Sequence, residues 1–154
     1  MLILAIAVLL PLSAFAQDNE WTQIHLLYNS DVGGKIEPCG WKSSRKGGVA
    51  RRATWFDEAW NSNEPFLLLD AGGLFGKRTL MEKEQSRFLC EVTSEFGYDA
   101  IGLGDEDLNY GIDFLREAIA EYSLPFTSAN VFETATGELL LPEYLKIKRG
   151  GITF

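Results

Sequence analysis

Three stretches of the sequence combine carboxylates with glycines, a pairing that suits the binding of a cation or a phosphate. Asp31 lies in YNSDVGG, Asp70 lies in LLLDAGG, and Asp105 lies with acidic neighbours in LGDEDLNYG. Carboxylate oxygens are preferred ligands of hard cations such as Mg²⁺ and Ca²⁺. Glycine allows the loop conformations that other residues rarely adopt. We therefore expect one shared site if the fold brings these stretches together.

Each of the three stretches follows an apolar run that reads as a strand, and the segments between them have helical spacing. The expected helices are 49–61, 80–96 and 112–121, and the expected strands are 21–29, 66–69, 98–103, 124–128, 139–147 and 152–154. Strands alternating with helices indicate an α/β fold with right-handed crossovers. Ligands of such folds bind outside the carboxyl ends of the strands, where the three acidic loops should meet.

Composition predicts a soluble acidic domain with a packed core. The chain has 154 residues, 46% of them hydrophobic, and its net charge is −8 from 22 acidic and 14 basic residues. A protein that binds the nucleic-acid backbone needs a basic face, so nucleic acid is not an expected partner. The oligomeric state does not follow from the sequence.

The first residues predict export. Residues 1–16 are uncharged, almost wholly apolar, and end in the small-x-small pattern Ala14-Phe15-Ala16. This pattern predicts a signal peptide cleaved after Ala16, and hence a periplasmic or extracellular protein without a membrane span. An uncleaved anchor is the alternative, although the run is short for a membrane span. The chain stops inside an expected strand, so we expect residues 17–154 to be a C-terminally truncated domain.

Five blocks in order resemble the calcineurin-like metallophosphoesterases, in particular the 5'-nucleotidase and UDP-sugar hydrolase family. These blocks are YNSDVGG, GGVARRAT, LLLDAGGLF, YDAIGLGDEDLNYG and SANV. The resemblance covers residues 24–154. It implies the N-terminal part of a four-layer α/β/β/α sandwich, a dinuclear centre of divalent metal ions, and a nucleotide or small phosphoester as substrate.

Carried over residue by residue, the resemblance implies an eroded metal site. Asp31 stands at the first aspartate ligand, but Gly33 replaces a histidine ligand and Gly73 replaces the bridging aspartate. Asp105 replaces an asparagine ligand, and Glu106 replaces the histidine that assists protonation of the leaving group. Two neighbouring cations need a bridging carboxylate, which glycine does not supply. The remaining histidine ligands of the family lie beyond the last residue.

The remaining carboxylates leave two interpretations open. Asp31, Asp105, Glu106 and Asp107 could form a weak oxygen site for Mg²⁺ or Ca²⁺. Alternatively, they are solvated loop carboxylates that cap helices or turns. The only histidine, His25, lies within the first expected strand and does not match a ligand position.

Cys39 lies in the sequence EPCGW, which resembles a UshA-like branch of the family that includes selenoproteins. In that branch a cysteine or selenocysteine follows EPCG, whereas this chain has Trp41. Two neighbouring chalcogens can form a reversible bridge, so a redox role of Cys39 is one hypothesis. Others are a structural or incidental thiol, a bond with Cys90, and a UGA codon translated as Trp41. The helical pattern around Cys90 favours a buried apolar residue instead.

Two functions compete at this stage. The family resemblance predicts an exported nucleotidase-like protein, weakly active or inactive as a phosphoester hydrolase because key ligands are replaced. The alternative is a thiol-linked or non-catalytic ligand-binding domain that uses the Cys39 loop. In either case the glycines are needed for the geometry of the loops.

Overall fold

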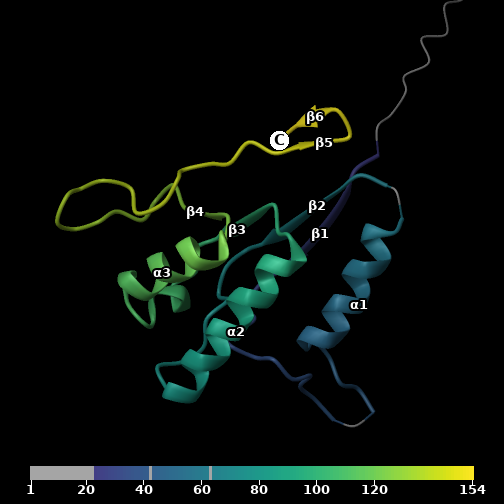
Figure 1. Cartoon of the computed structure of the whole chain (residues 1–154), viewed down its shortest axis with the longest axis horizontal. Coiled ribbons are helices and arrows are strands. Elements are labelled where there is room, and N and C mark those ends of the chain that lie inside the picture. Colours follow the sequence, from purple (N-terminus) through teal and green to yellow (C-terminus); the bar gives the residue numbers. More distant parts are fainter. Residues whose placement is uncertain (1–22, 42, 63) are drawn as a thin grey trace, which may run out of the picture.

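The computed structural model describes residues 23–41, 43–62 and 64–154, and it shows a parallel sheet with helices packed against it (Figure 1). The sheet has the strand order β1-β2-β3-β4. Its strands are β1 (His25–Asn29), β2 (Phe66–Asp70), β3 (Ala100–Gly102) and β4 (Phe126–Thr127). The helices are α1 (Val49–Trp60), α2 (Leu80–Phe96), α3 (Ile112–Tyr122) and the short 3₁₀ helix η1 (Glu106–Leu108). A two-stranded antiparallel ribbon follows, β5 (Lys148–Arg149) with β6 (Ile152–Thr153).

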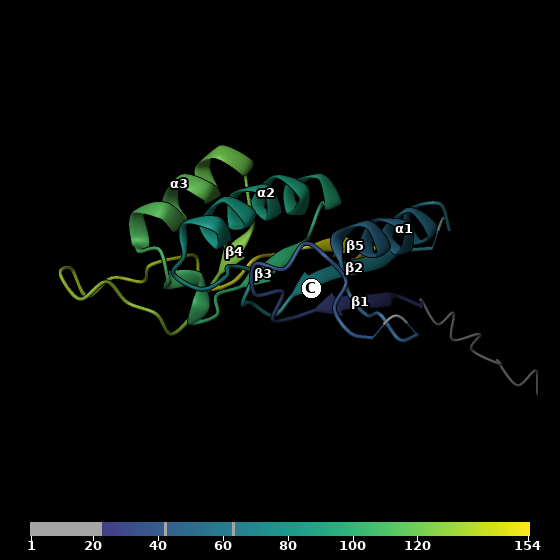
Figure 2. The ribbon, with the colours of Figure 1, turned by 90° about the horizontal axis from the view of Figure 1, so that it is seen from below.

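All three α-helices lie on the same face of the sheet (Figure 2). The strands pair in sequence order and in parallel, so each crossover leads to the next strand along. Right-handed crossovers that always advance in the same direction place every connecting helix on one face. The same topology brings the carboxyl ends of all four strands to one edge, as the sequence predicts.

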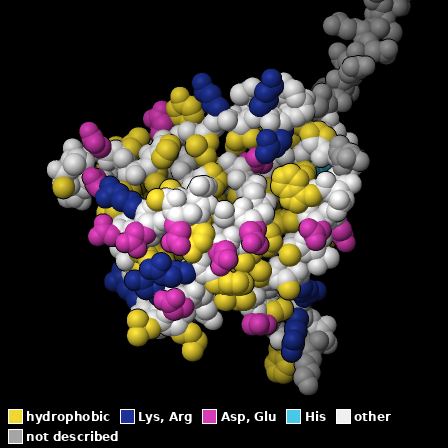
Figure 3. All heavy atoms as spheres, in the orientation of Figure 1, with side chains coloured by type: hydrophobic (Ala, Val, Ile, Leu, Met, Phe, Trp, Pro, Cys, Tyr) yellow, Lys and Arg dark blue, Asp and Glu magenta, His cyan; other side chains and the backbone are white. Residues whose placement is uncertain are grey.

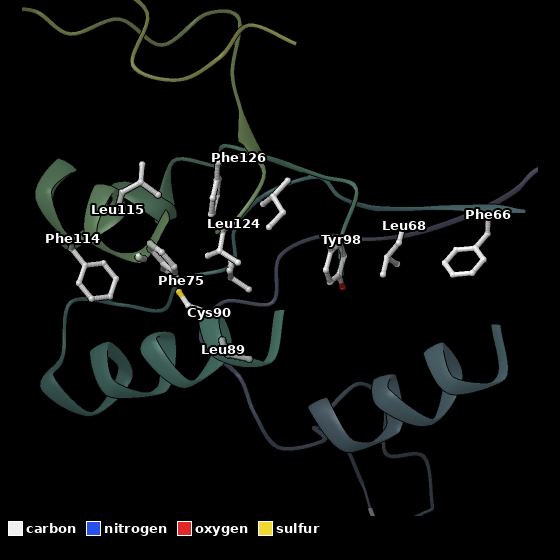
Figure 4. Packing of buried hydrophobic residues seen from close by; sticks show 13 residues of the cluster. Phe66, Leu68, Phe75, Leu89, Cys90, Tyr98, Phe114, Leu115, Leu124 and Phe126 are labelled. Atoms are coloured by element: carbon white, nitrogen blue, oxygen red, sulfur yellow. The ribbon is translucent and has the colours of Figure 1, made fainter. Parts of the chain in front are cut away.

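The hydrophobic core fills the space between the sheet and these helices (Figure 4). Leu68, Leu89, Ile101 and Leu115 are fully buried, and the ring of Phe75 packs edge-on against that of Phe114 at 5.2 Å between centroids. Four of the five residues of β2 are buried and Leu69 is half-buried, which explains its run of leucines without polar alternation. The central strand and the loop after it are therefore held by the core.

The predicted α/β class is confirmed, and the three expected helices agree with the structure to within about one residue at each end. The described residues build a sheet and one helical layer, which is part of the predicted four-layer sandwich. The third and fourth strands are shorter than expected, and the first begins at His25.

The expected strand 139–147 is wrong. Leu139 forms an isolated bridge with Phe132, and Ile147, at the other end, exchanges backbone hydrogen bonds of 3.0 and 2.8 Å with Phe154 next to the ribbon, but no strand forms between them. The carbonyl oxygen of Pro142 accepts two hydrogen bonds at the end of β4, from Ser128 N at 3.0 Å and from Thr127 Oγ1 at 2.7 Å. Proline has no N–H to donate to the hydrogen-bond ladder of a sheet, so this apolar run forms an irregular segment instead of a strand.

The predicted signal peptide, residues 1–16, lies outside the described residues. Among the residues that are described, no helix is both long enough and apolar enough to cross a membrane.

Candidate functional site

The loops that follow β1 and β2 run side by side at the carboxyl edge of the sheet. The amide of Asp31 donates to the carbonyl oxygen of Gly72 at 2.9 Å, and the amide of Gly33 donates to the carbonyl oxygen of Gly73 at 2.8 Å. The amide of Gly34 continues the series with the carbonyl oxygen of Leu74 at 3.0 Å. Two of the three predicted loops therefore extend the parallel pairing of their strands beyond the sheet.

The loop after β3 joins them through glycines that pack backbone against backbone. A Cβ atom built on Gly72 would lie 2.6 Å from the amide nitrogen of Gly104, and one built on Gly104 would lie 2.5 Å from that of Gly73. Real Cβ atoms do not approach this closely, so a side chain at either position would push the loops apart. The glycines are required by the fold, whether or not a ligand binds.

The carboxylate of Asp107 holds these loops together by hydrogen bonds. Its side chain is fully buried, and it accepts hydrogen bonds from the amides of Gly73 and Gly104, both at 2.9 Å, and of Phe75 at 3.0 Å. A buried carboxylate is stable only when such donors replace its water. Asp107 is thus a structural residue whose two oxygens already accept backbone hydrogen bonds, and it is not the solvated loop carboxylate that one of the two interpretations describes.

Asp31 and Glu106 face Gly73 and Gly33, the two glycines at positions where the family resemblance implies ligands. A Cβ atom on Gly73 would lie 3.1 Å from Asp31 Oδ1, and one on Gly33 would lie 3.9 Å from Glu106 Oε2. Both glycines have left-handed backbones, with φ of 76° at Gly73 and 58° at Gly33. The fold therefore gathers the positions that the family resemblance singles out, and it fills the space beside the glycines with carboxylates.

The donors at this edge do not fit a dinuclear metal centre. Asp31, Asp105 and Glu106 are exposed, and neither glycine has a side chain that could bridge two cations. Throughout residues 23–41, 43–62 and 64–154, no group of three or more His, Cys, Asp or Glu is arranged to hold a metal ion. His25 lies at the opposite end of β1, where its Nε2 is 2.5 Å from the carboxylate of Glu64.

A buried polar network lies beneath the loops, at the last residue pair of β1 and β2. Asn29 pairs in register with Asp70, and Asn29 Nδ2 donates to Asp70 Oδ2 at 2.6 Å. Asp70 Oδ1 accepts from the amide of Gly72 at 2.8 Å. The hydroxyl of Tyr98 donates to Asn29 Oδ1, and Arg52 Nη1 donates to that hydroxyl at 3.4 Å. This network links α1 to the start of the site.

Burial raises the pKa values of two groups in this network. Burial raises the pKa of Asp70 above its usual value, although hydrogen bonds from Gly72 and Asn29 oppose the shift. Burial also raises the pKa of Tyr98 to about 12. Sequence reasoning missed Asn29, Tyr98 and Arg52 because they come from three different elements. The sequence does carry one indication of this network: Asn29 and Asp70 are polar residues at the ends of apolar strands.

Cys39 and Cys90 are both free thiols in very different surroundings, so the alternative of a bond between them is wrong. Cys39 is exposed and lies on a hairpin, where its backbone pairs with that of Lys46 through hydrogen bonds of 3.0 and 2.8 Å. Cys90 is fully buried in the core, and this burial raises its pKa to about 12. Cys90 is therefore a core residue, as its helical pattern predicts.

Comparison with known proteins identifies relatives among nucleotide-cleaving enzymes, although no family model matches the chain. It is 29% identical over 116 residues to snake venom 5'-nucleotidase of Gloydius brevicauda, a match that covers 71% of this chain and 20% of that protein. It is 26% identical over 112 residues to 2',3'-cyclic-nucleotide 2'-phosphodiesterase/3'-nucleotidase of Yersinia enterocolitica, covering 68% of this chain and 17% of that protein. The chain thus spans about a fifth of the length of these relatives.

Solved structures show the same fold. The 5'-nucleotidase precursor from Thermus thermophilus matches with a TM-score of 0.66 and 24% identity, over 83% of this chain and 26% of that one. NAD nucleotidase from Haemophilus influenzae matches with a TM-score of 0.69 and 16% identity, over 83% and 24% of the two chains. The chain is related to the 5'-nucleotidases and has the fold of the N-terminal metallophosphoesterase domain of these proteins.

Proposed function

We propose that this chain is the N-terminal part of an exported 5'-nucleotidase-like protein whose dinuclear metal site is eroded, and which hydrolyses phosphoesters weakly or not at all. One observation carries the proposal: Gly33 and Gly73 stand at the carboxyl edge where the family has ligands, with exposed carboxylates beside them. The relatives that the chain matches are nucleotidases by name, which supports a nucleotide or small phosphoester as the ligand.

The physical reason is the missing bridge. A two-metal site lowers the barrier by holding both cations against the attacking and leaving oxygens of one phosphoryl group. Asp31, Asp105 and Glu106 contribute only oxygen donors on exposed loops, so any cation there keeps most of its water. Glu106 stands at the position of a family histidine and is the candidate general acid. Without the metals, the leaving oxygen of a phosphoester is not held where Glu106 could protonate it.

The test uses the full-length mature protein. Metal content is measured by mass spectrometry after incubation with Mn²⁺, Zn²⁺ or Ca²⁺, and hydrolysis of AMP and UDP-glucose is followed in the same samples. We expect fewer than two metal equivalents per chain and no turnover above background. The 5'-nucleotidase of Thermus thermophilus serves as the positive control. Two bound equivalents together with turnover would show that the site is intact.

A second candidate function is thiol-linked or non-catalytic ligand binding at the Cys39 loop. It is favoured by the exposure of the Cys39 thiol, in contrast to the burial of Cys90. Trp41, next to it on the hairpin, is 85% exposed and packs little surface into the protein. Reading the codon at position 41 tests the link to the selenoprotein branch: UGA would support a chalcogen pair, and UGG would exclude it.

A further inference from the structure

Two projections lie at the end of the molecule where the strands of the sheet have their carboxyl ends (Figure 1). The first is the Cys39 hairpin, residues 39–46, whose tip is a turn in which the amide of Ser44 donates to the carbonyl oxygen of Trp41 at 2.8 Å. The second is the segment 77–81, which leads into the first turn of α2. A groove of about 780 Å³ beside β1 is lined by part of the hairpin and by the loop of Asp31, so it belongs to the candidate site. Trp41 lies outside this groove.

Each projection exposes large apolar side chains to water. Trp41 is 85% exposed, and Leu80 and Met81 are 86% and 74% exposed. Hydrophobic side chains accordingly project at separate points along the lower edge of the molecule in Figure 3. Single exposed apolar residues are common on protein surfaces, so the meaning of these three depends on what surrounds them.

Basic side chains surround both tips. Residues 38–56, which contain the hairpin and the first two turns of α1, include five basic residues and no acidic one, although the whole chain carries a net charge of −8. At the second projection, Lys77 and Arg78 come directly before Thr79, the N-cap of α2. The exposed basic side chains of the two projections are Arg45, Lys46, Lys77 and Arg78.

These four side chains form no salt bridge with a carboxylate of the described residues. The salt bridges of this part of the chain use other cations, namely His25, Arg87, Arg116 and Arg149. Asp31, Asp105 and Glu106 are exposed at the same end, but they belong to the loops of the candidate site. Glu82, which follows the second projection, accepts a hydrogen bond from the hydroxyl of Thr79. Clustered positive charges cost free energy without a counter-charge, so the projections are matched to an anionic surface.

A membrane surface fits this combination better than a protein or a nucleic acid does. Tryptophan and leucine next to lysine and arginine are typical of segments that lie in the membrane interface. The core of a protein–protein interface is instead depleted of lysine and other charged residues. A nucleic acid would neutralise the charges, but it would leave Leu80 and Met81 in water.

We propose that this end of the molecule docks on a membrane surface rich in anionic lipids. Trp41 lies among the headgroups, Leu80 and Met81 contact the acyl chains, and the basic side chains of both projections bind lipid phosphates. The protein then lies on the membrane with the carboxyl edge of its sheet facing the lipid, and no spanning helix is needed. This inference goes beyond the proposed function, because vesicle binding does not depend on whether the metal site is intact.

The experiment measures binding of the mature protein, starting at Gln17, to vesicles by co-sedimentation. Vesicles of phosphatidylcholine alone are compared with vesicles that contain equal parts of phosphatidylcholine and phosphatidylglycerol. We expect the mixed vesicles to bind about tenfold more tightly, and added salt to weaken this binding, because the attraction is between exposed charges. Equal affinity for both kinds of vesicle, or no binding at millimolar lipid, would overturn the proposal.

Apolar contacts are tested at each projection separately. Trp41→Ser and Leu80→Ser/Met81→Ser should each weaken binding to the mixed vesicles about fivefold, since each removes exposed apolar surface from the contact. The matched control is Tyr144→Ser: Tyr144 is 60% exposed in the segment 139–147, which runs at the opposite end of the molecule (Figure 1). Its affinity should change less than about twofold. Losses no larger than that of the control would exclude docking by this end.

Charge contacts are tested by reversal. Lys77→Glu/Arg78→Glu changes two exposed residues outside the groove, and it should weaken binding to the mixed vesicles about tenfold. Lys146→Glu/Lys148→Glu makes the same charge change at the opposite end and should have less than about a twofold effect. Equal losses for the two pairs would mean that only net charge matters, which contradicts a docking end. Capture of the protein by immobilised polyglutamate or DNA, without binding to vesicles, would assign the charges to another partner and overturn the membrane.

Fluorescence quenching distinguishes insertion from attachment by charge alone. Phospholipids brominated on their acyl chains quench an indole that enters the membrane interface, so they should quench the fluorescence of the wild type in mixed vesicles. We expect about threefold less quenching in Trp41→Ser, because the indole at the tip of the hairpin is the one placed among the headgroups. Equal quenching of the two proteins would show that Trp41 stays in water, contrary to the proposal.

Discussion

At the scale of single residues, buried polar groups hold the loops at the edge of the sheet more firmly than any exposed carboxylate. Asp107 accepts three backbone hydrogen bonds, and Asp70 accepts two. Next to them, Tyr98 is 6% exposed and joins β1 to α1 through Asn29 and Arg52. The free energy of unfolding should therefore depend on the protonation of these groups.

The alkaline stability of the protein should depend on Tyr98. Its pKa is raised from 10.0 to about 12 by burial, so the folded state holds the phenolic proton more tightly than the unfolded state does. This contribution is complete below pH 10 and is lost as the pH rises through 12. A difference of about two pKa units corresponds to roughly 3 kcal/mol of unfolding free energy.

Urea unfolding of the wild type and Tyr98→Phe between pH 8 and 12 measures this effect. The variant lacks the titrating hydroxyl, so its free energy of unfolding should fall less steeply above pH 10. Other tyrosines and lysines titrate in both proteins, and their contribution cancels in the comparison. Parallel curves for the two proteins would mean that the hydroxyl ionises equally easily in the folded and unfolded states.

At the scale of elements, α2 is the helix whose ends are best defined. Thr79 is the N-cap: its Oγ1 accepts from the amide of Glu82 at 3.2 Å and donates to Glu82 Oε2 at 3.0 Å. Gly97 ends the helix with a left-handed backbone at φ of 67°. These two residues set the limits of the helix. Ser86, within the helix, contacts the loop after β2: its Oγ accepts from the amide of Gly76 at 3.1 Å.

Removing the cap should destabilise the protein measurably. Thr79→Ala leaves the amide of Glu82 without its partner, and we expect the free energy of unfolding to fall by about 1 kcal/mol. Thermal or urea unfolding measures the change. Thr54→Ala is the matched control: Thr54 is exposed within α1, its hydroxyl donates only to the carbonyl oxygen of Ala50, and alanine is the better helix former. A loss at Thr79 no larger than at Thr54 would argue against the cap.

At the scale of the whole molecule, an ion pair connects the C-terminal ribbon to the sheet. The side chain of Asp99, which precedes β3, is 6% exposed, and it pairs with Arg149 on β5. Its other oxygen accepts from the amide of Leu68 in β2 at 3.0 Å. The ribbon, β3 and β2 thus meet at one buried carboxylate.

We expect Arg149→Ala to lower the free energy of unfolding by about 2 kcal/mol, because it leaves the carboxylate of Asp99 buried without its cation. Arg116→Ala removes the cation of the more exposed pair with Glu133, and it should cost about 0.5 kcal/mol. Chemical denaturation of both variants tests the difference. If the two variants lost equal stability, burial of Asp99 would have no energetic consequence.

The sequence by itself determined the α/β class, the three long helices and the convergence of three acidic, glycine-rich loops. Helical spacing and buried apolar runs are local patterns, and the edge at which parallel strands end follows from their order. It also identified the relatives, because the motif blocks lie in a fixed order along the chain. The same local reasoning failed at 139–147, where an apolar run containing Pro142 packs without forming a strand.

Only the tertiary structure decided which acidic residues are structural and which face water. Asp105, Glu106 and Asp107 are neighbours in sequence, yet Asp107 alone is buried, since a 3₁₀ turn directs its carboxylate to three amides from two loops. The groove beside β1 likewise gathers residues from β1, the Cys39 hairpin and α1. Such groupings depend on how elements pack, and the free energy of a buried charge depends on donors that lie far away in sequence.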